Sequence, residues 1–246
     1  MKNLVCTFGY KGINHTLELR FIKGTAANEP FLFGAEEETR PIQLKDFYLA
    51  KFQTTQALWK YVTAKESKHW GFPGDCHPAE HVSWNDITNE GGFLARINDS
   101  NILSQIGRQH GSKFRLPSET EWEYAARGGP LWKNDLLFGG SNDPREVAWY
   151  LDNSGGQTHP VGQKSPNQLG LYDMNGNVWE WCQDAFIRDI AHIPGDGSPY
   201  NGSSNARILR GGCHHNGAVH CTNVKRYEIM PEFKDACIGF RLAMDA

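Results

Sequence analysis

The sequence has little of what marks a membrane protein or a nucleic-acid-binding protein. Its formal net charge over 246 residues is only −3, so no basic excess points to nucleic acid as a partner. No apolar run is long enough to span a membrane. The N-terminal residues lack the apolar core of a signal peptide, which predicts a cytoplasmic protein unless an export signal precedes them; display on a cell surface or a virus particle stays open.

Cysteine is also sparse. Six cysteines in a chain of this length do not make a disulfide framework, and none forms a C-x-x-C pair, so we expect reduced thiols. Long helical patterns are few, whereas the chain has 26 glycines and eight tryptophans. This composition predicts a loop-rich α+β fold whose core is held by aromatic side chains.

Local patterns predict short strands and short helices. Residues 1–24 alternate as a strand–turn–strand hairpin. Further strands are expected at 31–34, 42–49, 179–181, 207–212 and 238–243. Helices are expected at 55–63, after 81–86 and from Ser118, where Ser118 and Glu121 have the spacing of a capping box. No repeat or linker divides the chain, which predicts one domain over residues 1–246.

Several long stretches together resemble the formylglycine-generating-enzyme (sulfatase-modifying factor) family. They include VSWNDITNEGGFLARIN, RLPSETEWEYAARGG, GLYDMNGNVWEW, RILRGG and IGFRLA. The resemblance implies a single compact domain with a variant of the C-type lectin fold. Within it we expect an added N-terminal hairpin (1–24), a scaffold (25–209) and a C-terminal variable or binding region (210–243). The fold hosts oxidases, sulfoxide synthases and non-enzymatic binders, so the site must decide the function.

One enzymatic hypothesis is a copper-dependent oxidase or related thiol enzyme centred on Cys221. The family's oxidase binds Cu(I) through two cysteines in a C-x4-C arrangement after an Arg-Gly-Gly turn. In RGGCHHNGAVHC, Cys221 stands at the second of these positions and Asn216 at the first. An amide does not replace a thiolate on Cu(I), so we do not expect copper, or any organic cofactor, and we predict that the chain is not an enzyme.

A second hypothesis is a zinc or iron site built from the same stretch. Cys213, His214, His215, His220 and Cys221 are acceptable ligand types. Their spacing matches no standard zinc pattern, and adjacent His214 and His215 point to opposite faces if the segment is extended. We therefore favour polar side chains exposed on a loop.

The pattern of residues in the C-terminal segment favours a diversified binding surface. Positions that match the family surround positions that hold dissimilar residues. Most of these dissimilar residues can be encoded by changing the two adenines of an Asn codon. This is typical of the variable proteins of diversity-generating retroelements, which the chain resembles. We predict a protein or other macromolecular ligand bound through residues 213–237 by solvent-facing side chains. The predicted contacts are Cys213, His214, His215, Asn216, Gly217, His220, Thr222, Asn223, Tyr227, Ile229, Phe233, Asp235, Ala236 and Cys237. A drifted enzyme and a subunit that only mediates assembly are the alternatives.

The turn DMNGNV resembles the family's calcium loop. Carried over, the resemblance implies one structural Ca²⁺ bound by Asp173 and by the backbone oxygens of Met174, Gly176 and Val178. A plain Asn-Gly hairpin turn without metal explains the residues equally well. Arg115 and Arg241 are expected to pair with carboxylates such as Glu119 or Glu121 in a structural role.

Overall fold

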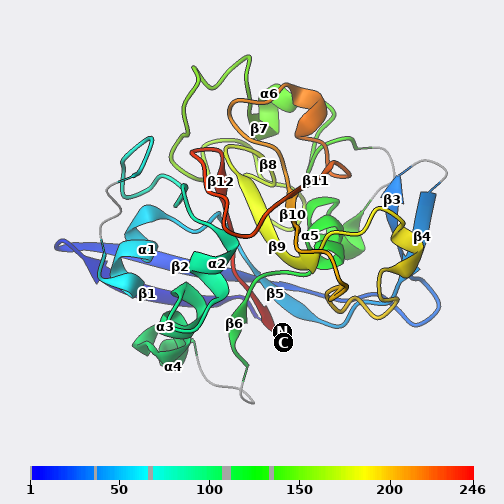
Figure 1. Cartoon of the computed structure of the whole chain (residues 1–246), viewed down its shortest axis with the longest axis horizontal. Coiled ribbons are helices and arrows are strands. Elements are labelled where there is room, and N and C mark those ends of the chain that lie inside the picture. Colours follow the sequence, from blue (N-terminus) through cyan, green and yellow to red (C-terminus); the bar gives the residue numbers. More distant parts are fainter. Residues whose placement is uncertain (1, 36–37, 66–68, 107–111, 133–135) are drawn as a thin grey trace.

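The computed structural model describes residues 2–35, 38–65, 69–106, 112–132 and 136–246. Figure 1 shows short helices and strands distributed among long connecting loops. The longest described strand has ten residues and the longest described helices have eight, which confirms the predicted loop-rich α+β fold. No helix in the described part of the chain has the length and apolar character needed to cross a membrane.

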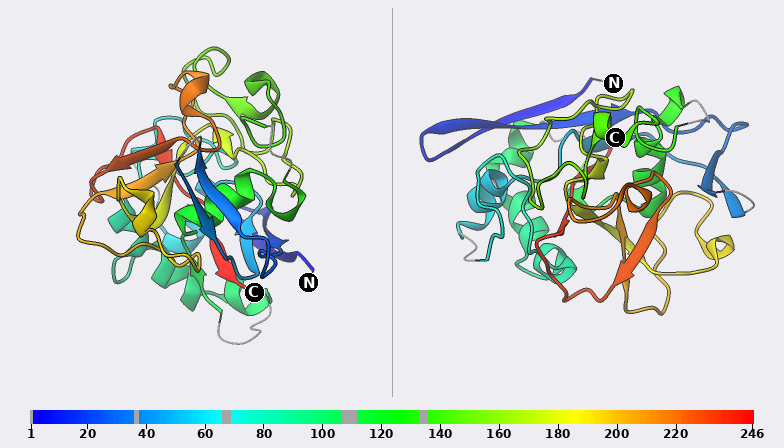
Figure 2. Two further views of the ribbon diagram at one scale, coloured as in Figure 1. Left: turned by 90° about the vertical axis from the view of Figure 1, so that its right-hand side faces the viewer. Right: turned by 90° about the horizontal axis from the view of Figure 1, so that it is seen from above.

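The first sheet joins the two ends of the chain. Its strands run antiparallel in the order β1-β2-β5-β13-β6 and span Leu4–Tyr10, Ile13–Ile22, Phe47–Ala50, Ala243–Asp245 and Phe114–Arg115. β1 and β2 form the predicted hairpin, with left-handed backbone at Lys11 and Gly12 in its turn. Because β2 also pairs with β5, the hairpin extends the central sheet, and Figure 2 shows its far end projecting from the molecule.

The second sheet carries the C-terminal segment. Its order is β11-β10-β9-β12, with strands at Arg226–Ile229, Arg207–Arg210, Trp179–Ala185 and Ile238–Gly239. Trp179 and Trp181 on β9 are buried, as predicted. Two small sheets pair β3 with β4 (Phe31–Ala35, Glu38–Ile42) and β7 with β8 (Ala148–Trp149, Asn175–Gly176).

Most of the described helices begin at a side-chain cap, whereas α3 (Phe93–Asp99) begins at Gly92 without one. In chain order α1 to α6 span Gln56–Thr63, Trp84–Thr88, Phe93–Asp99, Asn101–Gln105, Glu119–Ala126 and Pro144–Val147, with 3-10 turns at 129–131, 190–192 and 218–220. Thr55 caps α1, and the predicted capping box of Ser118 and Glu121 starts α5. Every residue of α5 is buried, so its glutamates lie inside the protein.

Three predicted elements differ in the structure. The strand predicted at 42–49 is divided between β4 and β5, because residues 43–46 turn to bond Gly24 and Thr25. The strand predicted at 238–243 is likewise divided between β12 and β13. Asn175 and Gly176 do not form a hairpin turn; they make β8, which runs parallel to β7.

A buried carboxylate connects the two sheets. Glu180 on β9 is fully buried and accepts hydrogen bonds from Arg241 (2.6 and 2.7 Å) and from Trp122 Nε1 (2.7 Å). Arg241 also donates to the carbonyls of Ala50 and Tyr172. Arg241 therefore pairs with Glu180 rather than with a glutamate of α5, whereas Arg115 pairs with Glu121 at 2.7 Å, as expected.

The predicted calcium turn packs against the same cluster. Gln53 Nε2 lies 3.2 Å from the carbonyl oxygen of Asp173, 3.3 Å from that of Gly176 and 3.0 Å from that of Val178, as well as 3.0 Å from Glu180 Oε1. The Asp173 carboxylate instead accepts from the backbone N–H of Gly162 at 2.7 Å. The reverse orientation of the amide would place Oε1 among four oxygens, so the nitrogen belongs there.

An amide donor thus lies where two of the expected calcium ligands, the carbonyls of Gly176 and Val178, converge. The two N–H groups of this amide are shared among these oxygens, and the Asp173 carboxylate accepts from Gly162. Gln53 Oε1 is buried with no hydrogen-bond partner among the described residues. Four converging oxygens are a donor set that Ca²⁺ prefers, but here the amide nitrogen of Gln53 lies among them. Calcium binding stays a prediction from the resemblance, and the geometry favours a turn closed by Gln53.

We therefore expect Ca²⁺ and a calcium chelator to leave the melting temperature unchanged. A site filled at 100 times its Kd would add about 2.7 kcal/mol of stability. In a chain of this size that gain corresponds to about 5–10 °C. Differential scanning calorimetry checks this, and Gln53→Glu is the matched variant. Its carboxylate would face four oxygens, so we expect it to be destabilised and to recover stability with Ca²⁺. A rise of several degrees in the unmodified protein would contradict the interpretation.

Candidate functional site

The C-terminal segment, residues 213–237, leaves the second sheet through a tight glycine turn. β10 ends at Arg210, and both Gly211 and Gly212 have positive φ (95° and 74°). A Cβ on Gly212 would lie 2.5 Å from Cys221 Sγ, so only glycine fits there. The segment then forms a loop, strand β11 and a second loop before it reaches β12, and Figure 1 shows it in orange to red.

Fixed contacts hold this segment to the scaffold. Arg210 is fully buried, pairs with Glu119 (3.1 Å) and Glu123 (2.5 Å), and donates to the carbonyl of Asn223. Arg226 at the start of β11 reaches the same Glu119 at 2.7 Å. These ion pairs fix the backbone at both sides of the first loop.

The predicted contact residues are only partly at the surface. His215, His220, Tyr227 and Phe233 are exposed. Half-buried positions are Asn216, Gly217, Thr222, Ile229, Asp235, Ala236 and Cys237. The expectation of solvent-facing side chains is wrong for the remaining three, Cys213, His214 and Asn223, which are at most 3% exposed.

Each of these three side chains has a structural partner inside the protein. Asn223 accepts from Asn175 Nδ2 at 3.2 Å and donates to the carbonyl of Leu136. His214 Nδ1 lies 3.0 Å from the carbonyl of Asn177, and Cys213 packs in the core cluster that contains Trp179 and Trp181. They belong to the frame rather than to the surface.

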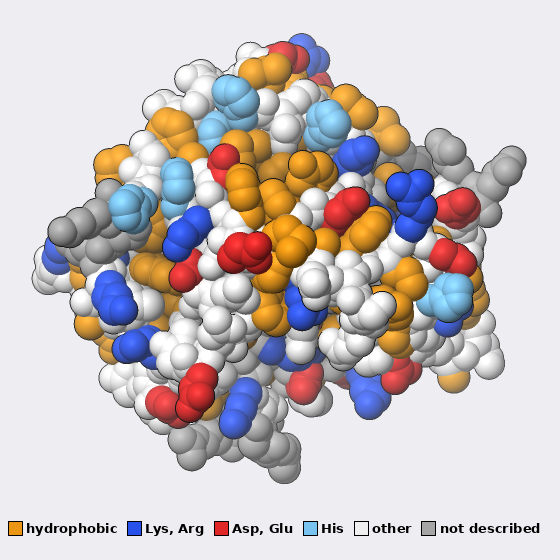
Figure 3. Space-filling model, viewed as in Figure 1, with side chains coloured by type: hydrophobic (Ala, Val, Ile, Leu, Met, Phe, Trp, Pro, Cys, Tyr) orange, Lys and Arg blue, Asp and Glu red, His pale blue; other side chains and the backbone are white. Residues whose placement is uncertain are grey.

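The structure also exposes two apolar residues that the sequence interpretation missed. Val219 is 67% and Met230 44% exposed, beside Tyr227 and Phe233 at 47% and 43%. The sequence could have indicated their exposure, since both are apolar residues in otherwise polar loops. Figure 3 shows hydrophobic side chains gathered in the middle of this face, among histidines and charged groups. Such a mixture is typical of protein-contact surfaces.

Cys221, the centre of the enzymatic hypothesis, is fully buried. It packs with Phe138, Val147, Ala148 and Tyr150. Burial raises the pKa of its thiol to about 12, so the thiol is neutral at physiological pH and a poor nucleophile or ligand. Asn216, at the other family position, has its Oδ1 3.1 Å from Cys213 Sγ.

A different grouping of metal-capable side chains forms instead. Ligand atoms of Cys213, His214 and Cys237 all lie within 4.8 Å of one another. His215 and His220, candidates of the zinc or iron hypothesis, are exposed on the loop, and neither joins this group among the described residues. Burial lowers the pKa of His214, so its imidazole is neutral.

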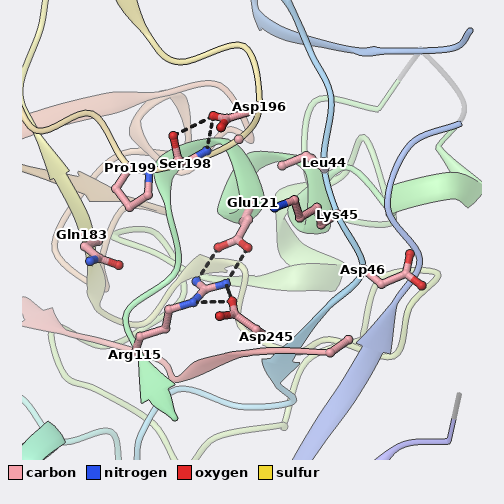
Figure 4. A pocket seen from close by; sticks show the side chains of 12 residues that line it. Leu44, Lys45, Asp46, Arg115, Glu121, Gln183, Asp196, Ser198, Pro199 and Asp245 are labelled. Carbon is pink, nitrogen blue, oxygen red and sulfur yellow. Dashed lines mark hydrogen bonds and ion pairs between the residues drawn. The ribbon is translucent and has the colours of Figure 1, made fainter. Parts of the chain in front are cut away.

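A hollow at the end of the first sheet contains an arginine that is already paired with two carboxylates. Figure 4 shows Arg115 at its floor, between Glu121 and Asp245, which lie 2.7 and 2.6 Å from its guanidinium nitrogens. Two carboxylates already neutralise this arginine, so it is not available to bind an anion. No residue of the C-terminal segment lines this hollow.

The chain is similar in sequence to several known proteins. The chain is 35% identical over 179 residues to chaperone protein LppX of Paenibacillus barcinonensis and 32% identical over 207 residues to the formylglycine-generating enzyme of Streptomyces coelicolor. These matches cover 57% and 77% of this chain. The chain spans only 63% and 59% of the length of these two curated relatives.

Among solved structures, Treponema denticola variable protein 1 superposes with a TM-score of 0.77 at 28% identity. That match covers 98% of this chain and 99% of the variable protein. The model of the sulfatase-modifying factor enzyme 1-like domain matches residues 21–246. The expected formylglycine-generating-enzyme-type C-type lectin fold is thereby confirmed, and the chain belongs to the sulfatase-modifying factor enzyme 1-like family.

Proposed function

We propose that this protein is the non-catalytic variable protein of a diversity-generating retroelement, which binds a macromolecule through its C-terminal segment. The observation that carries the proposal is the superposition over nearly the whole length of both chains with variable protein 1. The exposed side chains of residues 215–233 then supply the contact surface.

The composition of that surface suits a protein ligand. Of the ten large hydrophobic side chains exposed in the described residues, four are Val219, Tyr227, Met230 and Phe233. Tyr227 stacks on Trp179 with ring centroids 5.6 Å apart, so its ring is already ordered before binding. Aromatic side chains held in this way lose little conformational entropy on binding and often dominate interface energy.

The state of Cys221 supports the absence of catalysis. A copper oxidase of this family would need two thiolates, whereas this chain has one buried neutral thiol and an asparagine. The similarity to the formylglycine-generating enzyme of Streptomyces coelicolor favours the alternative, a thiol enzyme centred on Cys221. The two functions differ in whether Cys221 contacts a metal or substrate.

Sequencing the DNA that flanks the gene is the most direct test. We expect a near-copy of the segment encoding residues 210–243 beside a reverse transcriptase gene, with differences confined to adenines of the copy. Differing codons should fall on exposed positions such as His215, His220, Tyr227 and Phe233, and spare Asn223, because its side chain is buried in the frame. The absence of any such copy would contradict assignment to a retroelement.

The exposed positions should accept very different side chains. A variant with His215→Asp, His220→Tyr, Tyr227→Asp and Phe233→His should keep its melting temperature within about 4–8 °C, because surface substitutions each change stability by about 0.5 kcal/mol. The matched control is Asn223→Ala on the same segment. It leaves the amide of Asn175 short of a buried acceptor and should cost about 1–3 kcal/mol by itself. If the surface variant does not fold, this segment is not a tolerant binding surface.

Copper binding separates the two functions. We expect Cys221→Ala to leave the Cu(I) affinity of the reduced protein unchanged in a competition titration with a chromophoric Cu(I) chelator. Any Cu(I) taken up by other thiols is present in both proteins, so the comparison isolates Cys221. Cys76→Ala, at an exposed cysteine, is the control. Loss of tight Cu(I) binding in Cys221→Ala alone would favour the oxidase.

A further inference from the structure

Two cysteines and a histidine from opposite ends of the C-terminal segment meet beneath its surface. Cys213 and His214 follow the glycine turn after β10, and Cys237 directly precedes β12. Their ligand atoms lie within 4.8 Å of one another, although Cys237 is far from the other two in the sequence. Cys213 and His214 are buried, and Cys237 is half-buried.

One ring nitrogen of His214, Nδ1, is held by a hydrogen bond, and the other, Nε2, points away from that bond. Its Nδ1 lies 3.0 Å from the carbonyl oxygen of Asn177, which fixes the proton on Nδ1 and leaves the lone pair on Nε2. The backbone N–H of His214 donates to the same carbonyl of Asn177, and Ser154 Oγ donates to the backbone carbonyl of His214 at 2.7 Å. Metal-binding histidines are usually oriented in this way, by a hydrogen bond from the ring nitrogen that does not bind the metal, here Nδ1, to a backbone carbonyl.

The Asn177 carbonyl is itself rigidly placed. The side chain of Asn177 accepts from the backbone N–H of His159 at 2.9 Å and donates to the carbonyl of His159 at 3.1 Å. The ring of Phe72 packs edge-on against His214 with centroids 5.3 Å apart. His214 therefore has little freedom to rotate away from the two thiols.

The thiols also have supporting contacts. Cys213 Sγ accepts from the backbone N–H of His215 at 3.4 Å and lies 3.1 Å from Asn216 Oδ1. The backbone of Cys237 is held by its N–H, which donates to Asp235 Oδ1 at 2.7 Å. Two sulfurs and one imidazole nitrogen are a donor set for zinc rather than for calcium or magnesium, which prefer oxygen.

We propose that Cys213, His214 and Cys237 bind one zinc ion through two thiolates and the Nε2 of the imidazole. The two thiol protons leave to solvent as the ion binds. Three protein ligands leave a fourth position for water or for a donor atom of a bound molecule. The site does not involve Cys221 and stands independently of the proposed function.

Zinc titration of the reduced, metal-stripped chain tests the proposal. We expect one equivalent to bind in competition with a chromophoric chelator. Cobalt in place of zinc should give the thiolate charge-transfer and ligand-field absorption of a tetrahedral sulfur site. Cys213→Ser and Cys237→Ser should each weaken binding by about 100-fold or more, since loss of a mere supporting contact already costs about 10–100-fold. Cys76→Ser and Cys221→Ala should bind as the unmodified protein does.

Absence of stoichiometric zinc binding by the reduced chain would overturn the proposal, as would unchanged affinity in both serine variants. If those variants do not fold, thiol alkylation of the unmodified protein replaces them. Zinc should slow alkylation of Cys237 severalfold and leave the exposed Cys76 unaffected, as read by peptide mass spectrometry. Equal rates at Cys237 with and without zinc would also overturn it.

Discussion

The buried carboxylate of Glu180 is the contact on which the rest of the fold depends. It accepts hydrogen bonds from Arg241 near the C-terminus, Trp122 on α5 and Gln53 before α1. A buried charge is costly unless it is paired, so the position of Glu180 depends on all three of these partners. Removing one partner of such a pair costs about 3–5 kcal/mol, whereas most surface substitutions cost far less. Stability is thus concentrated at the junction of the two sheets.

This concentration explains how the C-terminal segment can combine a fixed backbone with unconstrained side chains. Arg210 and Arg226 attach it to Glu119, and Asn175 Nδ2 donates to the carbonyl of Cys221 at 2.6 Å. The exposed side chains between these points, such as His215 and His220, do not contribute to the core. A surface of this kind can change composition without unfolding the protein, which is the physical requirement for a diversified binding site.

Local signals predicted most of the elements, and tertiary partners account for what they missed. The capping box at Ser118 and the alternation of the N-terminal hairpin act within a few residues, so the sequence reveals them directly. The pairing of Gln53 with the 173–178 turn, by contrast, joins residues more than 100 positions apart. Codon and spacing arguments marked Asn223 as variable, but they carry no information about burial, and its partner Asn175 makes it part of the frame.

The proximity of Cys213, His214 and Cys237 has a consequence for recognition. These residues lie at the two ends of the segment that carries Tyr227 and Phe233, so an ion shared between them would close that segment into a loop. Closing the loop removes conformational freedom that a ligand would otherwise have to remove on binding. The side chains beneath the surface would then order it, while those on the surface set which ligand is bound. Buried and exposed positions of the segment therefore serve separate requirements, rigidity and specificity, and can vary independently.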